Sequence, residues 1–204
     1  MIRALLRDRR GGGAAEFALV LPILLIFLFG IIDAARLAWD YNRIAKATQM
    51  GVRMAAVTDV LDSGLEEASY VGFATSDGRM LTQGDRIPQD ALGKLVCTED
   101  GCTCAEEGTC PDTDEFRDQA FNDIFERMQA IYPEVTSDKV RVTYSGSGLG
   151  YAGDPNGMDI SPTVTVSIVG MTFSPISLLA MTAFQLPDFR TSLVMEDGVG
   201  DASN

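Results

Sequence analysis

The sequence has 204 residues, 46% of them hydrophobic, which is enough for one domain of moderate size and an additional apolar segment. Its net charge of −13 would repel a phosphate backbone, so we exclude nucleic acid as a partner. The chain contains no histidine, which removes the commonest general base and the commonest metal ligand.

An apolar segment near the N-terminus predicts a membrane span. Residues 17–32 read FALVLPILLIFLFGII without a charge, and flanking alanines extend the run to the ~20 residues that a helix needs to cross a bilayer. A cleaved secretory signal has a shorter apolar core followed by a small-x-small site, so we expect the span to be retained. Because arginines precede the span, the positive-inside rule places the N-terminus in the cytoplasm: Arg3, Arg7, Arg9 and Arg10.

The same helix is expected to continue outside the membrane. From Leu37 to Ala55 apolar side chains recur at steps of three and four, and no proline interrupts the pattern before Gly64. We therefore predict a transmembrane segment at 12–35 and a periplasmic continuation at 36–61 whose single apolar face packs on a later sheet. Gly51 lowers helix propensity by ~1 kcal/mol relative to alanine, and we interpret it as a site of close packing.

Residues 62–204 predict a periplasmic α+β domain. Glycine, aspartate, serine and threonine dominate residues 62–111, which we interpret as loops with one short helix near 89–96. An amphipathic helix follows, with Asp112 as the N-cap, Glu115 as its capping-box partner and Pro133 as the stop. Its predicted buried face consists of Phe116, Ala120, Ile124, Met128 and Ile131.

The C-terminal third changes to the two-residue period of β-strands. KVRVTY at 139–144 and TVTVSIV at 163–169 alternate branched or aromatic with polar side chains, and FRTSLVM at 189–195 is a third candidate. The predicted fold is thus a membrane-anchored α+β protein with a long N-terminal helix, a second amphipathic helix and a small antiparallel sheet of about three strands. The glycines between the first two strands have the wrong spacing for a nucleotide site.

Four cysteines form the pattern C-x4-C-x-C-x5-C in a Cys-rich loop at 97–110: Cys97, Cys102, Cys104 and Cys110. Structural zinc sites favour ligand pairs two to four residues apart, and an exported domain favours disulfides, so we predict two disulfide bonds and no metal. A bond between Cys102 and Cys104 would be strained, which leaves 97–102 with 104–110, or 97–104 with 102–110. Without histidine or a nucleophile elbow we assign no catalytic residue and no cofactor, and we expect no enzymatic activity.

Several segments together carry a resemblance to a known family. The first is GGGAAEFALVLP at 11–22, and ATQMGVRMAAVTD follows in the expected helix. Further along the chain come IYPEV, VRVTYSGSGLG, PTVTVSI and LPDFRTSLVMED. In these segments the chain resembles TadE-like proteins, which are pseudopilins of the tight-adherence (Flp-type) pilus machinery of bacteria. The resemblance spans most of the chain apart from residues 62–111.

The resemblance implies a pilin-like fold and a non-enzymatic role as a minor pilin in pilus assembly. A prepilin peptidase would cut between Gly11 and Gly12, remove a basic leader at 1–11 and leave Glu16 at position five of the mature chain. Cuts after Gly12 or Gly13 are alternatives. Glu16 would then pair with the new amino terminus of a neighbouring subunit during assembly.

The same resemblance implies the location and partners of the protein. It would be a single-pass protein of the bacterial inner membrane, with a periplasmic C-terminal domain, that can enter the extracellular pilus. Its partners would be other pilin-like subunits, the prepilin peptidase, the membrane and the inner-membrane assembly platform. A permanently anchored periplasmic binding or adhesion protein that stays outside the pilus is the alternative.

Overall fold

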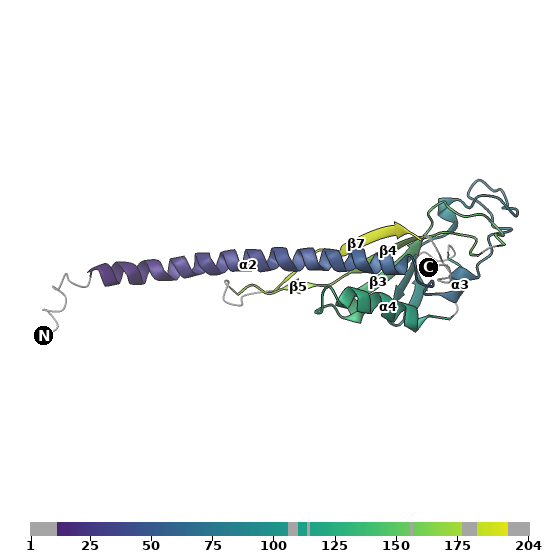
Figure 1. Cartoon of the computed structure of the whole chain (residues 1–204). Helices are drawn as coiled ribbons and strands as arrows, with labels where there is room; N and C mark the ends of the chain where they lie inside the picture. Colours follow the sequence, from purple (N-terminus) through teal and green to yellow (C-terminus); the bar gives the residue numbers. More distant parts are fainter. Residues whose placement is uncertain (1–11, 106–109, 114, 156, 177–182, 196–204) are drawn as a thin grey trace. The chain divides into compact units, whose positions relative to one another are not determined.

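The computed structural model describes residues 12–105, 110–113, 115–155, 157–176 and 183–195 (Figure 1). The chain divides into two compact units. The anchor unit comprises the residues up to Tyr41 together with Thr172–Leu186, and the sheet unit comprises Asn42–Met171 and the residues from Pro187 onward. Helix α2 (Gly12–Ala55) supplies its apolar half to the anchor unit and its amphipathic half to the sheet unit.

The anchor unit consists of a helix and a short ribbon. The sequence predicts a long N-terminal helix, and α2 has 44 residues and continues through Pro22 without interruption (Figure 1). Two short strands, β5 (Thr172–Phe173) and β6 (Phe184–Gln185), pair antiparallel. This ribbon is absent from the sequence prediction because strands of two residues carry no periodic signal.

Helix α2 ends at Ala55, before the predicted end at residue 61, and the cause of this correction is tertiary. The Leu61 N–H donates to the Tyr144 hydroxyl over 3.2 Å, and the Leu61 carbonyl accepts from the Arg117 N–H over 2.9 Å. The Arg117 guanidinium also donates to the Val60 carbonyl over 2.9 Å. The Leu61 N–H would bond within the helix if α2 continued to residue 61, so its contact with Tyr144 competes with that last turn.

The sheet unit is built on an antiparallel sheet of five strands in the order β2-β1-β3-β4-β7. The three predicted strands are confirmed as β3 (Val140–Ser145), β4 (Thr163–Ile168) and β7 (Phe189–Val194). The predicted strand count needs correction, because β1 (Leu95–Thr98) and β2 (Gly101–Cys104) form a hairpin within the Cys-rich segment predicted as a loop. Each has only four residues, too few for the alternation to stand out.

One face of the sheet forms the core of the sheet unit. In β3 and β4 every second side chain is buried: Val140, Val142, Tyr144, Val164, Val166 and Ile168. Helix α4 (Asp118–Gln129) and the C-terminal part of α2 pack on this face, since a Cβ at Gly51 would lie 2.6 Å from Met128 Sδ of α4 and 3.1 Å from Val166 of β4. The interpretation of Gly51 as a close-packing position is therefore confirmed.

Helix α4 begins at Asp118, so the predicted capping box at Asp112 and Glu115 is wrong. Residues 115–117 instead pair with residues 61–63: the Ser63 N–H donates to the Glu115 carbonyl over 3.1 Å, and the Ser63 hydroxyl accepts from the Glu115 N–H over 3.0 Å. These groups are no longer available to a helical first turn. The predicted buried positions Ala120, Ile124 and Met128 are confirmed.

Two short helices lie between α2 and α4: α3 (Ser63–Glu66) and the 3-10 turn η2 (Gln89–Ala91). A further 3-10 turn, η3 (Ser137–Lys139), follows α4. The helix predicted near 89–96 is reduced to η2, because Leu95 and Val96 belong to strand β1 and pair with β3. An added Cβ at Gly64 would lie 2.0 Å from the Asp112 carbonyl oxygen, so α3 packs closely against the segment that leads to α4.

We predict that Gly51→Val lowers the free energy of unfolding of the sheet unit by about 1–3 kcal/mol, because the new side chain overpacks the contact with Met128 and Val166. Thermal unfolding in detergent, followed by circular dichroism, measures this change. Gly30→Val in the same helix is the control, since a Cβ there meets nothing within 4 Å. Equal melting temperatures for the two variants would contradict the close packing.

Candidate anchoring and assembly site

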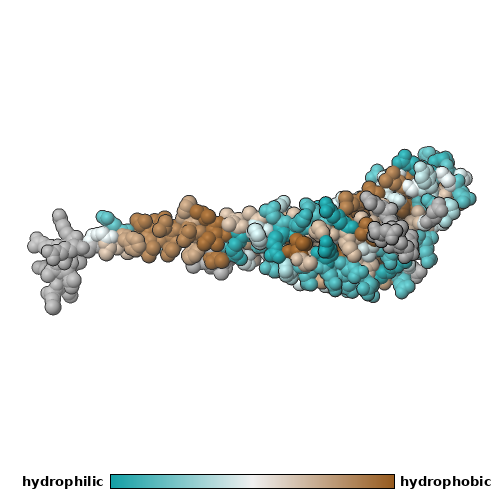
Figure 2. All heavy atoms as spheres, viewed as in Figure 1, coloured by the Kyte–Doolittle hydropathy of each residue, from teal (hydrophilic) through white to brown (hydrophobic). Residues whose placement is uncertain are grey.

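The N-terminal half of α2 presents an apolar surface without cover from the rest of the described chain (Figure 2). Within it Leu19, Ile23 and Phe27 are 74%, 70% and 68% exposed. The helix is long and apolar enough to cross a membrane. A surface of this kind is favourable in lipid or against other apolar helices, as the predicted span requires.

Glu16 lies at the start of this surface, one helical turn after Gly12 and on the same face of α2. Its side chain is exposed, and no hydrogen bond or ion pair joins it to another residue that the structure describes. An added Cβ at Gly12 or Gly13 would meet nothing within 4 Å, which leaves the start of the helix open to another helix. Gly11, the other residue of the predicted cleavage site, lies outside the described residues.

At the other end of the apolar run, the Asp33 carboxylate bonds to Arg36 and to the backbone of Ile176, and the sequence did not predict this pair of contacts. Asp33 is 6% exposed, and its Oδ1 accepts from Arg36 Nη1 over 3.1 Å and from the Ile176 N–H over 2.9 Å. The Arg36 guanidinium lies 5.4 Å from the centre of the Phe173 ring. An Asp and an Arg three residues apart are visible in the sequence, but the contact with Ile176 depends on the fold.

The four cysteines form two disulfide bonds, Cys97–Cys102 and Cys104–Cys110, which is one of the two pairings that the sequence left open. No cysteine is free, so the zinc interpretation loses its thiolate ligands. The first bond closes the β1–β2 hairpin, where the two cysteines are register partners. The second ties the end of β2 to the segment before α4.

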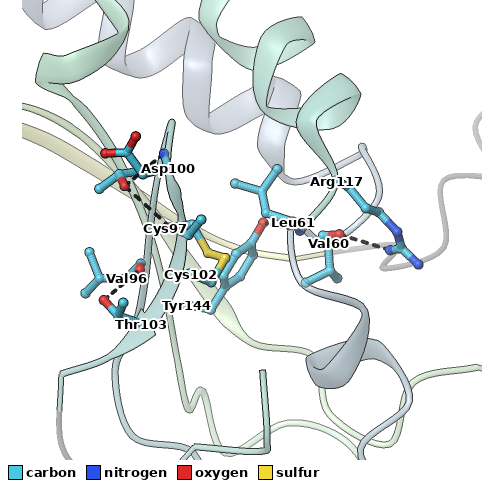
Figure 3. The surroundings of a disulfide bond; sticks show 11 residues. Val60, Leu61, Val96, Cys97, Asp100, Cys102, Thr103, Arg117 and Tyr144 are labelled. Carbon is cyan, nitrogen blue, oxygen red and sulfur yellow. Dashed lines mark hydrogen bonds between the residues drawn. A yellow bond between two sulfur atoms is a disulfide. The ribbon is translucent and has the colours of Figure 1, made fainter. Parts of the chain in front are cut away.

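The Cys97–Cys102 bond lies beside the polar contacts that end α2 (Figure 3). Cys97 and Tyr144 are both 0% exposed, and the Tyr144 ring lies beside the disulfide with its hydroxyl toward Leu61. Burial raises the pKa of the Tyr144 hydroxyl, which therefore stays protonated in the folded chain. The disulfide thus closes an edge of the core and leaves no reactive thiol there.

The comparison with protein families agrees with the N-terminal geometry. Residues 11–53 match the family described as TadE-like protein, which agrees with the resemblance over most of α2. The matched range includes Gly11, Gly12, Glu16 and Asp33. No curated protein and no solved structure matches the chain.

Two double variants test the disulfide pairing by thiol counting under non-reducing, denaturing conditions. Replacing Cys97 and Cys102 by Ser leaves the Cys104–Cys110 bond intact, so we expect no free thiol. Replacing Cys97 and Cys104 removes one partner from each bond and is expected to expose both remaining thiols. The opposite result would establish the 97–104 and 102–110 pairing. Because its loop is short, loss of the Cys97–Cys102 bond is expected to lower the free energy of unfolding by about 2 kcal/mol.

Proposed function

We propose, from the TadE-like character of residues 11–53, that this chain is a non-enzymatic minor pilin or pseudopilin of a tight-adherence (Flp-type) pilus system. The observation that carries the proposal is the exposed apolar half of α2 with Glu16 at its start. In this role α2 anchors the chain in the bacterial inner membrane. The basic residues before the helix stay in the cytoplasm, and the sheet unit stays in the periplasm.

The apolar half of α2 supports both locations that a pilin occupies. Each large apolar side chain that leaves water contributes about 1.5–3 kcal/mol, so the helix is held firmly in the bilayer. Lipid tails are as apolar as the helix, and hydrophobicity alone therefore does not favour contact with a second helix over contact with lipid. Close packing at small residues and specific polar contacts must supply that preference. Gly12, Gly13 and Glu16 offer both at one end of the helix.

Proteolytic processing would complete the assembly site. Removal of residues 1–11 by a prepilin peptidase leaves an ammonium group on Gly12, one helical turn from Glu16. When helices pack in a pilus, the ammonium group of one subunit meets the Glu16 carboxylate of its neighbour. In an apolar surrounding such a pair adds little net stability, but leaving either charge alone is costly. The pair therefore sets the register between subunits.

The partners follow from these steps. They are the membrane, the prepilin peptidase, the inner-membrane assembly platform and other pilin-like subunits, which would contact the apolar surface of α2.

We predict that the protein isolated from its native membrane begins at Gly12. The expected cut follows Gly11 because only this cut places Glu16 at position five. Intact-mass measurement of the native protein checks the prediction, and a start at Gly13 or Ala14 would move the cut by one or two residues. A native chain that still begins at Met1 would contradict processing and favour a permanently anchored periplasmic binding or adhesion protein.

Replacement of Glu16 tests the charge pair. Glu16→Gln keeps the size and polarity of the side chain and removes its charge, so we expect normal membrane insertion and leader removal but few or no pili. The unpaired ammonium group would cost about 3–5 kcal/mol at each contact between subunits. Blots of membrane and sheared-pilus fractions, with pili counted by microscopy, measure both effects.

Glu126→Gln is the matched control for this experiment, because Glu126 is an exposed carboxylate on α4 in the sheet unit. It is expected to leave pili unchanged. Glu16→Leu adds a second comparison, since it removes the charge from the membrane edge and makes insertion slightly more favourable. Normal pili in both Glu16 variants would show that Glu16 has no role in pairing.

A further inference from the structure

The proposed function uses α2 but leaves the β5–β6 ribbon of the anchor unit without a role. We propose that this ribbon is a second membrane contact, with Ile176 and Phe184 in the lipid headgroup region beside the end of the membrane-spanning helix. The proposal rests on the part of the proposed function that places α2 across a membrane. The partner is the lipid surface itself.

The ribbon runs along α2 toward its apolar half. Phe173 in β5 lies against Arg36, with 5.4 Å between the guanidinium carbon and the ring centre. Further along the chain, the Ile176 N–H donates to the Asp33 carboxylate over 2.9 Å. The contacts therefore move from Arg36 to Asp33 on the helix as the chain moves from Phe173 to Ile176. Asp33 directly follows the uncharged run of residues 17–32, so Ile176 is held at the end of that run.

Large apolar side chains are exposed on both the ribbon and the helix. Ile176 is 58% exposed and Phe184 is 44% exposed on the ribbon, and Ile31 and Ile32 of α2 are 54% and 41% exposed. The sequence from 172 to 186 has no charged residue, whereas 22% of the whole chain is charged. The ribbon thus continues the apolar surface of the helix.

Aromatic residues lie on the other side of this boundary. Trp39 follows Ile32 by two helical turns on the same stripe of α2 and is 67% exposed, and Tyr41 is 48% exposed. Trp and Tyr are enriched where a membrane protein meets the headgroups, because one part of the ring is apolar and the other is polar. These residues and the ribbon mark the same boundary between lipid and water.

The backbone of the ribbon limits its depth. A two-stranded ribbon leaves unpaired N–H and C=O groups along both edges, which the hydrocarbon core does not tolerate but water among the headgroups can satisfy. The Asp33 carboxylate is not left unpaired near the hydrocarbon either, because Arg36 and the Ile176 N–H bond to it. A contact in the headgroup region satisfies both the apolar side chains and the polar backbone.

Tryptophan quenching by lipid tests the proposal in the full-length chain. Trp39→Phe removes the one native tryptophan. Leu24→Trp, Thr172→Trp and Ile176→Trp then place single reporters in the span, in β5 and beside Asp33. Each variant is placed as one copy per nanodisc in phosphatidylcholine brominated near the carboxyl end of its acyl chains. We expect strong loss of fluorescence for Leu24→Trp and Ile176→Trp and much less for Thr172→Trp.

The possible outcomes separate this proposal from the proposed function. Quenching of Leu24→Trp without quenching of Ile176→Trp would overturn the ribbon contact and leave the membrane span intact. Failure of Leu24→Trp to be quenched would overturn both. If Ile176→Trp is shielded from water only in discs that hold several copies, the partner is a neighbouring subunit. That outcome would also overturn the lipid contact.

A second pair of variants tests the role of Asp33 in holding the ribbon. In the Ile176→Trp background, Asp33→Asn keeps an acceptor oxygen for the Ile176 N–H and is expected to preserve the quenching. Asp33→Leu removes the acceptor and is expected to reduce it, while quenching of Leu24→Trp in the same Asp33→Leu background remains unchanged. Equal quenching of Ile176→Trp in both variants would show that Asp33 does not hold the ribbon at the membrane.

Discussion

Helix α2 has side chains that suit an apolar environment along its first half and water on one side of its second half. The first half of α2 has no charge between Glu16 and Asp33 and is exposed along its length, whereas the second half buries Ile44, Ala47 and Val52 against the sheet unit. A side-chain pattern that suits lipid on all sides cannot also suit water, so the environment must change along the helix. The positions of the other elements follow from where that change occurs.

In the sheet unit, the amphipathic half of α2 is held by close packing against α4 and the sheet. Gly51 lets α2 lie so close to Met128 and Val166 that even an added Cβ would crowd both side chains, so the helix, α4 and the sheet share a single core. The disulfides add to this core near the edge strand β2, which each of the two bonds ties to another segment.

In helix α2, a carboxylate stands at each end of the uncharged apolar run. Glu16 stands without a described partner at one end, and Asp33 is buried and bonded at the other. This difference has a physical meaning, because an unpaired carboxylate is available for an intermolecular contact whereas a saturated one is a structural element. Assembly in the proposed function therefore acts through the first, and the ribbon is held by the second.

The sequence by itself determined the long helix, its apolar half, three of the strands and the presence of disulfides, because each depends on local periodicity or on composition. The motif around Glu16 could also be identified from the sequence, since it lies in one continuous segment that matches the family. Tertiary structure decided the rest. Residues 115–117 look like a helix start but pair with residues 61–63, Leu61 looks helical but bonds to Tyr144, and the cysteines allow two pairings until β1 and β2 align Cys97 with Cys102. Asp33 reads as the first charge after a membrane span until Ile176, distant in sequence, donates to it. Apart from the cysteine pairing, which the β1–β2 hairpin decides, the deciding partner lies far along the chain, where local propensity carries no information about it.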